Sequence, residues 1–180
     1  MPVPVWLRPI EFRVEGRDRL RPLAWTALGG LVLGAAMAVF GLPPIDIHGP
    51  LHYVGIMDPL CGGTRSVWAA LSGDVATSWR YNPLGIVLVA GAAGTLVRFA
   101  FGVVTGRWIN VYVRSWAVVA GLGGVAFGLL AARQQLNADL LSSPPGSFSP
   151  VGLFLNVLPV LVMVVWVRVQ RRRMIAGARR

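Results

Sequence analysis

The stretch MDPLCGGTR, residues 57–65, combines residue types that catalyse reactions or bind ligands. It holds the only cysteine of the chain, Cys61, together with an aspartate, two adjacent glycines and Arg65. His48 and His52 lie shortly before it. Thiols, imidazoles and carboxylates bind transition metals, and a thiolate activated by a histidine is a nucleophile. The stretch is therefore a candidate metal site, covalent catalyst, anion-binding loop or simple tight turn.

Its spacing does not favour a metal or a covalent catalyst. Gly49-Pro50 separate His48 from His52, so no helix carries both on one face. With Asp46, Asp58 and Cys61 nearby, the group still matches no recognised metal-binding spacing. One cysteine cannot form an internal disulfide, and no third residue that would orient a histidine against it is identifiable. We predict no catalytic residue, metal or other cofactor.

The segment Gly62-Gly63 followed by Thr64 and Arg65 is suited to simpler chemistry. Glycines before a helix leave backbone N–H groups free, next to the positive helix end and the arginine. This suits a phosphate or carboxylate, and a phospholipid headgroup is the obvious local anion. The structural alternative is that the glycines only make the turn and Thr64 caps the helix. Arg65 then pairs with Asp58 or Asp74.

The composition is that of an integral membrane protein. Of 180 residues, 55% are hydrophobic and 13% are charged, and the mean hydropathy is +0.63. The charges lie in blocks that leave apolar runs of about 20 residues, enough to cross a bilayer. The formal charge of +10 comes from arginines beside these runs, where they bind anionic headgroups. The aromatic-studded basic groove that nucleic-acid binding requires is missing, so we predict no such partner.

We predict one all-α domain with four transmembrane helices and both termini in the cytoplasm. In chain order the segments are a basic arm that is amphipathic or irregular (1–21), helix one (22–42), an extracytoplasmic loop (43–82), helix two (83–104), a cytoplasmic loop (105–114), helix three (115–132), an outer loop (133–150), helix four (151–167) and a basic tail (168–180). Thirteen arginines lie on the predicted cytoplasmic side and three on the other, as the positive-inside rule requires.

Ala36-Met37-Ala38 resembles a signal-peptide cleavage site, but the preceding region is too long and partly acidic, so we expect a retained helix.

The long outer loop contains two short helices that form a cap between helices one and two. TRSVWAALSG predicts a helix that Thr64 caps and Gly73 ends. DVATSWRYNP predicts a second helix that begins at the cap residue Asp74. Asn82 then caps the next transmembrane helix, with Pro83 in its first turn. Because loops of this length are rarely structureless, we expect the cap to be packed.

Within the predicted spans, Arg98 is a candidate functional residue. It lies about two turns from the cytoplasmic end, and no span offers it an acidic partner. We favour a side chain that snorkels to the membrane surface over one that faces the bundle.

Asn156 and Pro159 predict a kink in helix four. Small residues four apart predict close packing within the chain, with homo-oligomerisation as the alternative; the pairs are Gly30 and Gly34, Gly91 and Thr95, and Gly124 and Gly128.

CGGTR (61–65), SGD (72–74) and YNP (81–83) resemble the motif of a family of small bacterial membrane proteins, the domain of unknown function 2752. Its pattern is approximately C-P-x-C-G-x-T-R, a short helix, G-D and N-P, and the resemblance covers about residues 50–100. It implies a multi-pass protein of the bacterial inner membrane with no established activity. The candidate binding residues, for an anion, a lipid headgroup or a structural role, are then Cys61, Gly62, Gly63, Thr64, Arg65, Gly73, Asp74, Asn82 and Pro83.

The chain departs from that pattern at Asp58, which stands where the first cysteine is expected. A dithiol reaction is therefore unavailable to it. We expect a non-enzymatic accessory, assembly or lipid-binding protein, whose partners are the bilayer, anionic phospholipids and a membrane protein or a second copy. One alternative is an enzyme acting on a lipid or envelope substrate at the outer face, with Asp58 or Asp74 as acid–base and Arg65 holding an anionic group. The other is a small transporter or channel.

Overall fold

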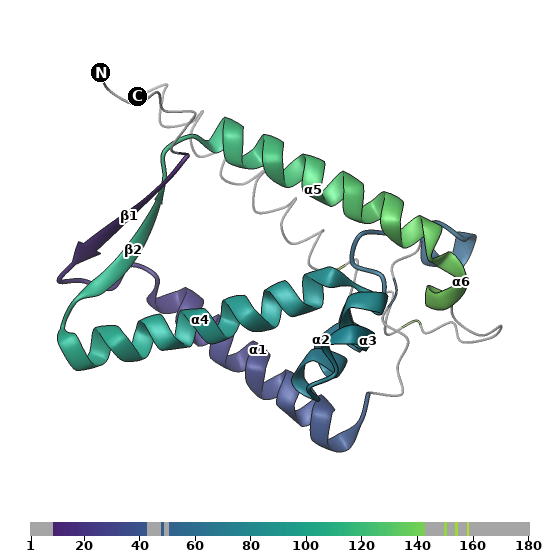
Figure 1. Cartoon of the computed structure of the whole chain (residues 1–180), viewed down its shortest axis with the longest axis horizontal. Helices are drawn as coiled ribbons and strands as arrows, with labels where there is room; N and C mark the ends of the chain where they lie inside the picture. Colours follow the sequence, from purple (N-terminus) through teal and green to yellow (C-terminus); the bar gives the residue numbers. More distant parts are fainter. Residues whose placement is uncertain are drawn as a thin grey trace.

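The computed structural model describes residues 9–42, 48, 51–142, 150, 154 and 158. The chain is mostly helical (Figure 1). Its elements are β1 (Ile10–Glu15), α1 (Arg21–Phe40), a 3-10 helix (His52–Val54), α2 (Gly63–Leu71), α3 (Val75–Tyr81), α4 (Pro83–Thr105), β2 (Trp108–Val113), α5 (Trp116–Leu136) and α6 (Ala138–Leu141).

Three helices, α1, α4 and α5, are long and apolar enough to cross a membrane. They overlap the first three predicted spans, and such helices indicate a membrane protein. The predicted fourth span (151–167) and the basic tail lie outside the described residues, apart from Phe154 and Leu158. The count of four spans and the cytoplasmic termini therefore stay predictions.

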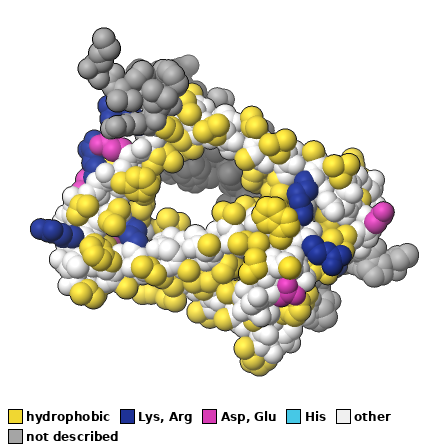
Figure 2. All heavy atoms as spheres, viewed as in Figure 1, with side chains coloured by type: hydrophobic (Ala, Val, Ile, Leu, Met, Phe, Trp, Pro, Cys, Tyr) yellow, Lys and Arg dark blue, Asp and Glu magenta, His cyan; other side chains and the backbone are white. Residues whose placement is uncertain are grey.

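Of the three long helices, α1 and α4 pack against each other, whereas α5 is held mainly at two ends of the molecule. In Figure 1, α1 packs beneath α4, whereas α5 runs along the opposite side. We call the end with β1 and β2 the sheet end, and the end with α2, α3 and α6 the cap end. Figure 2 shows an opening between these parts, bordered by hydrophobic side chains. Gln134, at the cap end, is the only buried residue of α5.

The small residues do not pack within the described chain as predicted. At Gly34 a methyl group would overlap the side chain of Leu71 on α2. At Gly30, Gly91, Gly124 and Gly128 an added methyl group would meet no described atom within 4 Å. Of these five glycines, only Gly34 therefore packs closely against another described element, and homo-oligomerisation stays a prediction.

The prediction of an all-α fold is wrong at the sheet end. The arm predicted to be amphipathic or irregular forms β1, which pairs antiparallel with β2 from the predicted loop 105–114; the register runs from Ile10 opposite Val113 to Glu15 opposite Trp108. Both strands, IEFRVE and WINVYV, alternate apolar and polar residues over most of their length. This period of two is typical of a strand with one apolar face.

Arg98 joins α4 to the sheet end through Asp18, and its snorkelling to the membrane surface stays a prediction. One of its terminal nitrogens lies 2.6 Å from a carboxylate oxygen of Asp18, and the two side chains are only 12% and 7% exposed. The guanidinium also donates hydrogen bonds to the carbonyl of Ile109 and to the side-chain oxygen of Asn110. The acidic partner comes from the arm that precedes the first span, 80 residues away in the chain.

The buried pair predicts a test of coupling between arm and helix. Arg98→Met should lower the free energy of unfolding by about 3 kcal/mol, because Asp18 is left as a buried charge without its partner. Adding Asp18→Leu to that variant should restore much of the loss. The measurement is reversible unfolding in mixed micelles. If the double variant loses as much stability as the sum of the losses in the two single variants, the side chains are not coupled.

Candidate functional site

The family-like motif folds the cap, and Gly62 begins its first helix. Gly62 is the N-cap of α2 and has a φ of 74°, in the left-handed region that favours glycine. A methyl group there would lie 2.7 Å from a side-chain carbon of Leu141 and 3.1 Å from the carbonyl oxygen of Tyr81. The predicted cap residue, Thr64, instead lies inside α2 and is exposed, so that prediction is wrong.

The other two predicted caps are confirmed. The Asp74 carboxylate accepts a hydrogen bond of 2.9 Å from the backbone N–H of Thr77 at the start of α3. That backbone hydrogen bond holds the pKa of Asp74 below its ordinary value. The Asn82 side-chain oxygen accepts from the N–H of Leu84, 2.9 Å away, and Pro83 is the first residue of α4. Gly73, with a φ of 84°, makes the turn between α2 and α3.

Asn82 and Gln134 fasten the cap to the long helices. Both side chains are fully buried. The Asn82 amide donates to the carbonyls of Pro59 and Cys61, at 2.9 and 3.0 Å. The Gln134 amide, from α5, donates to the same Cys61 carbonyl and, at 2.8 Å, to that of Tyr81. These bonds satisfy backbone groups where the chain leaves helical structure, which is necessary wherever water is excluded.

Ser66, Ser78 and Gly85 complete this buried polar cluster. The Ser66 hydroxyl lies 2.8 Å from that of Ser78 and donates to the carbonyls of Ser78 and Asn82. All of these serine and asparagine side chains are fully buried. A methyl group at Gly85 would overlap Ser66, so the glycine lets α4 approach α2 closely. The cluster fixes how α2, α3 and α4 meet.

Cys61, His52 and His48 are brought together, but not in a metal-binding arrangement. The sulfur of Cys61 lies 3.7 Å from Nδ1 of His52, and both residues are buried. The rings of His48 and His52 stack with centroids 3.7 Å apart, a geometry in which their nitrogen lone pairs do not converge on one ion. Across the described ranges, no group of three His, Cys, Asp or Glu residues is arranged to hold a metal. Cys61 packs with Met57 and Leu141 as part of the cap core.

Arg65 does not make either of the predicted ion pairs. Its guanidinium lies over the ring of Tyr81, 5.7 Å from the centroid. One predicted partner, Asp58, accepts a hydrogen bond of 2.7 Å from the N–H of Leu60. The other, Asp74, is the cap of α3. Neither carboxylate forms an ion pair with Arg65 in the described part of the chain.

Two more arginines surround the last turn of α3. Arg133, from α5, donates to the carbonyls of Trp79 and Arg80, at 2.7 and 3.4 Å. The Arg80 side chain itself is exposed. We call Arg65, Arg80 and Arg133 the cap arginines. In Figure 2, basic side chains at the cap end lie close to one another on the visible face.

The cap arginines differ electrostatically from those at the sheet end. Four ion pairs join described residues, and all lie at the sheet end: Arg13–Glu11, Arg19–Glu15, Arg98–Asp18 and Arg114–Glu11. No cap arginine pairs with an acidic side chain among the described residues. The cap end also holds Asp58, Asp74 and Asp139, so its arginines do not outnumber its acidic residues. The guanidinium groups nevertheless form no ion pair within the described chain, and an external anion can therefore bind them.

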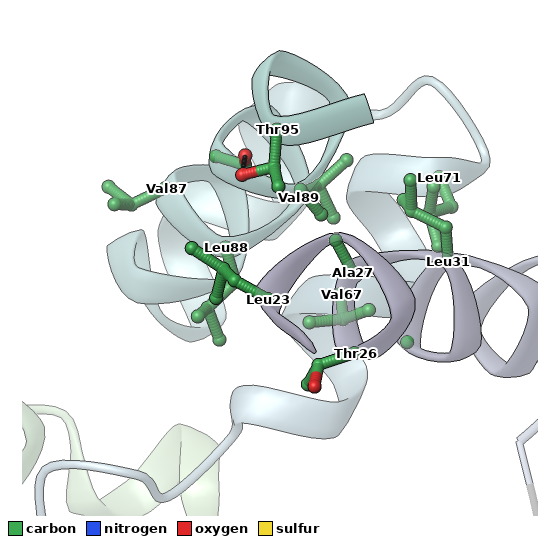
Figure 3. Close-up of a pocket in the computed structure, with 13 residues that line it drawn as sticks. Leu23, Thr26, Ala27, Leu31, Val67, Leu71, Val87, Leu88, Val89 and Thr95 are labelled. Carbon is green, nitrogen blue, oxygen red and sulfur yellow. Dashed lines mark hydrogen bonds between the residues drawn. The ribbon is translucent and has the colours of Figure 1, made fainter. Parts of the chain in front are cut away.

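An apolar cavity of about 490 Å³ lies between α1, α2 and α4 (Figure 3). Its walls are mainly Leu and Val side chains, with Gly30 and Gly91. The two hydroxyls in the lining are already used: those of Thr26 and Thr95 donate to backbone carbonyls of their own helices, at 3.0 and 2.8 Å. The cavity therefore offers an occupant only hydrocarbon contacts.

The sequence interpretation missed the residues that come from far along the chain. Gln134 and Gln135 both bind the cap; Gln135 accepts from the N–H of Met57 at 2.9 Å and donates to the carbonyl of Gly55 at 3.1 Å. Two adjacent amides at the end of an apolar helix are the signal that could have drawn attention to them. Ser66 and Ser78 gave no such signal, because single serines in short helices are common at surfaces.

Comparison with known proteins supports the resemblance at this site. Residues 51–96 match the model of a protein family of unknown function (DUF2752). No curated protein and no solved structure matches the chain. The matched DUF2752 stretch contains α2, α3, the first half of α4 and most of the buried polar cluster, but not Gln134.

The two glycines of the motif predict opposite responses to alanine. Gly62→Ala should destabilise the protein by more than 1 kcal/mol, because φ is positive and the methyl group meets Leu141 and Tyr81. Gly63→Ala is the matched control: it has no positive φ and open space around it, so stability should be unchanged or slightly higher. Thermal unfolding in detergent measures both. Equal effects at the two positions would contradict the assigned roles.

Asn82 provides a second test of the cluster. Asn82→Asp keeps the shape of the side chain but removes the amide that donates to Pro59 and Cys61, and it buries a carboxyl group. The free energy of unfolding should fall by more than about 2 kcal/mol, because each buried polar group left without a hydrogen-bond partner costs about 1–3 kcal/mol. Thr64→Ala is the control and should have no effect. Significant destabilisation by the control would instead support a capping role for Thr64.

Proposed function

We propose that the chain is a non-enzymatic accessory protein of the bacterial inner membrane that binds an anionic lipid at its cap end. The observation that carries the proposal is the group of cap arginines without acidic partners in the described chain. Guanidinium groups bind phosphate readily, and each basic residue near an anionic surface contributes about 1 kcal/mol. The predicted orientation, with both termini in the cytoplasm, puts this group at the outer leaflet.

The surroundings of the cap arginines also suit a lipid. Trp79 is 58% exposed and lies beside Arg80, and exposed tryptophans favour the membrane interface. α2 carries Arg65 and also contributes Val67 and Leu71 to the apolar cavity. Charge for a headgroup and space for hydrocarbon therefore occur on one short helix. The volume of about 490 Å³ falls in the range of small-molecule sites.

The motif residues themselves support a binding role over catalysis. Asn82, Gly62 and the Cys61 carbonyl are turned inward and serve the fold of the cap. Asp58 and Asp74, the carboxylates that an enzyme would use as acid and base, accept backbone hydrogen bonds at helix or turn starts. In an envelope-modifying enzyme, one of these carboxylates would have to give up its backbone hydrogen bond in order to act as acid or base. A transporter is favoured least, because Arg98 is engaged by Asp18.

Lipid retention tests this function. In native mass spectrometry of the detergent-purified protein, phosphatidylglycerol should be retained in preference to phosphatidylcholine. Arg65→Gln and Arg80→Gln should each weaken retention roughly fivefold, as expected for about 1 kcal/mol per arginine. Arg80→Lys keeps the charge and is the matched control, with near-normal retention expected.

Two results would count against the proposal. Equal retention of both lipids by the unmodified protein would show that the cap has no preference for anions. Retention of phosphatidylglycerol that survives both glutamine substitutions would place the anion elsewhere. A stable protein partner in place of lipid would favour an assembly role for the same surface.

A further inference from the structure

The two-stranded sheet has one face that is entirely apolar. Along β1, Ile10, Phe12 and Val14 alternate with charged residues, and their partners on β2 are Val113, Val111 and Ile109. Directly opposed residues of an antiparallel pair project to the same side. These six side chains therefore form one continuous surface, which we call the apolar sheet face.

The β1 half of the apolar sheet face is largely uncovered, and of its β2 half Val111 is exposed while Ile109 and Val113 are half-buried. The opposite face is mostly polar and internally bonded. Phe12, Val14 and Ile10 are 70%, 64% and 43% exposed. On the other face, the Tyr112 hydroxyl and the Asn110 amide both donate to Glu15, at 2.8 and 2.6 Å. The hydrogen bond from Tyr112 holds the pKa of Glu15 below its ordinary value. An exposed apolar cluster of this kind marks an interaction surface.

The position of the sheet identifies what that surface meets. β1 leads into α1, and β2 lies between α4 and α5, so the sheet adjoins the ends of all three candidate spans. β2 lies beside the last turns of α4. A methyl group at Gly102 would overlap the Trp108 ring, and Arg98 donates a hydrogen bond to the carbonyl of Ile109. From Arg98 to the end of α4 is about 10 Å at 1.5 Å per residue. Interfacial elements bury their apolar faces to a depth of about 5–10 Å.

The charges around the sheet suit a lipid surface. Residues 9–21 and 106–115 hold six arginines and three acidic residues. Figure 2 shows charged side chains on the outer margin of this end and hydrophobic side chains beside the opening. Trp116 and Trp25, at the ends of the adjoining helices, are 73% and 57% exposed, as tryptophans of an interfacial belt are.

We propose that the apolar sheet face is buried in lipid at the membrane interface, so that the sheet anchors the three helix ends to the bilayer surface. The partner is the bilayer itself: acyl chains cover the six apolar side chains, and anionic headgroups meet the flanking arginines. This proposal is independent of the cap arginines and of which leaflet the sheet end adjoins.

Spin labels on the two faces of β1 test the proposal. Phe12→Cys and Arg13→Cys are labelled in separate full-length proteins reconstituted in vesicles of phosphatidylcholine and phosphatidylglycerol. The unmodified protein, whose Cys61 is 3% exposed, gives the background. Collision with oxygen, which concentrates in lipid, and with a water-soluble nickel chelate is then measured. The label at 12 should favour oxygen severalfold, and the label at 13 should favour the nickel chelate.

The other outcomes overturn the proposal. If the label at 12 meets the nickel chelate as often as the label at 13, the face lies in water. If it meets neither reagent, protein covers the face, from another part of this chain or from a second copy. Should Phe12→Cys fail to reconstitute, Val14→Cys and Ile10→Cys place a label on the same face, and the same criteria apply.

Discussion

The cap end depends on one constraint: backbone groups that leave helical structure next to apolar helices must find hydrogen-bond partners inside the protein. Between residues 57 and 82 the chain turns repeatedly, and hydrocarbon cannot satisfy the carbonyls that these turns release. Asn82 and Gln134 supply amide donors for three of them, those of Pro59, Cys61 and Tyr81. Because Gln134 comes from α5, the same bonds that satisfy the turns also attach the third long helix to the cap.

The sheet end solves a related problem with charge. Arg98 would be costly inside a membrane without a partner. The arm brings Asp18 to it and the strand β2 brings Asn110 and a backbone carbonyl, so the guanidinium is bonded on several sides. The arm is thereby held against α4, and β1 can pair with β2. Each end of α5 is thus attached through polar contacts, while the residues between make few contacts with the described chain.

Local features could be predicted from the sequence, and distant ones could not. Asp74 and Asn82 were identified as caps because a cap and its helix are adjacent in the chain, and the apolar runs identified α1, α4 and α5 by length. The prediction that Thr64 is a cap was wrong, because Gly62, which has a positive φ, caps α2 two residues earlier in the chain. Arg98 with Asp18, and Gln134 with Cys61, lie 80 and 73 residues apart. Such pairs follow from how helices are arranged in space, which no single motif determines.

Asp58 stands where the resemblance leads us to expect a cysteine, and its role in this structure is local. Asp58 begins a turn: its side chain accepts from the N–H of Leu60, and its carbonyl accepts from the N–H of Cys61 at 3.1 Å. Aspartate favours this conformation because its side chain can bond to the backbone two residues ahead. The turn that presents the Cys61 carbonyl to Asn82 and Gln134 therefore forms without a second thiol. What the cap requires at Cys61 is the carbonyl oxygen and a small apolar side chain, and neither requirement involves the reactivity of sulfur.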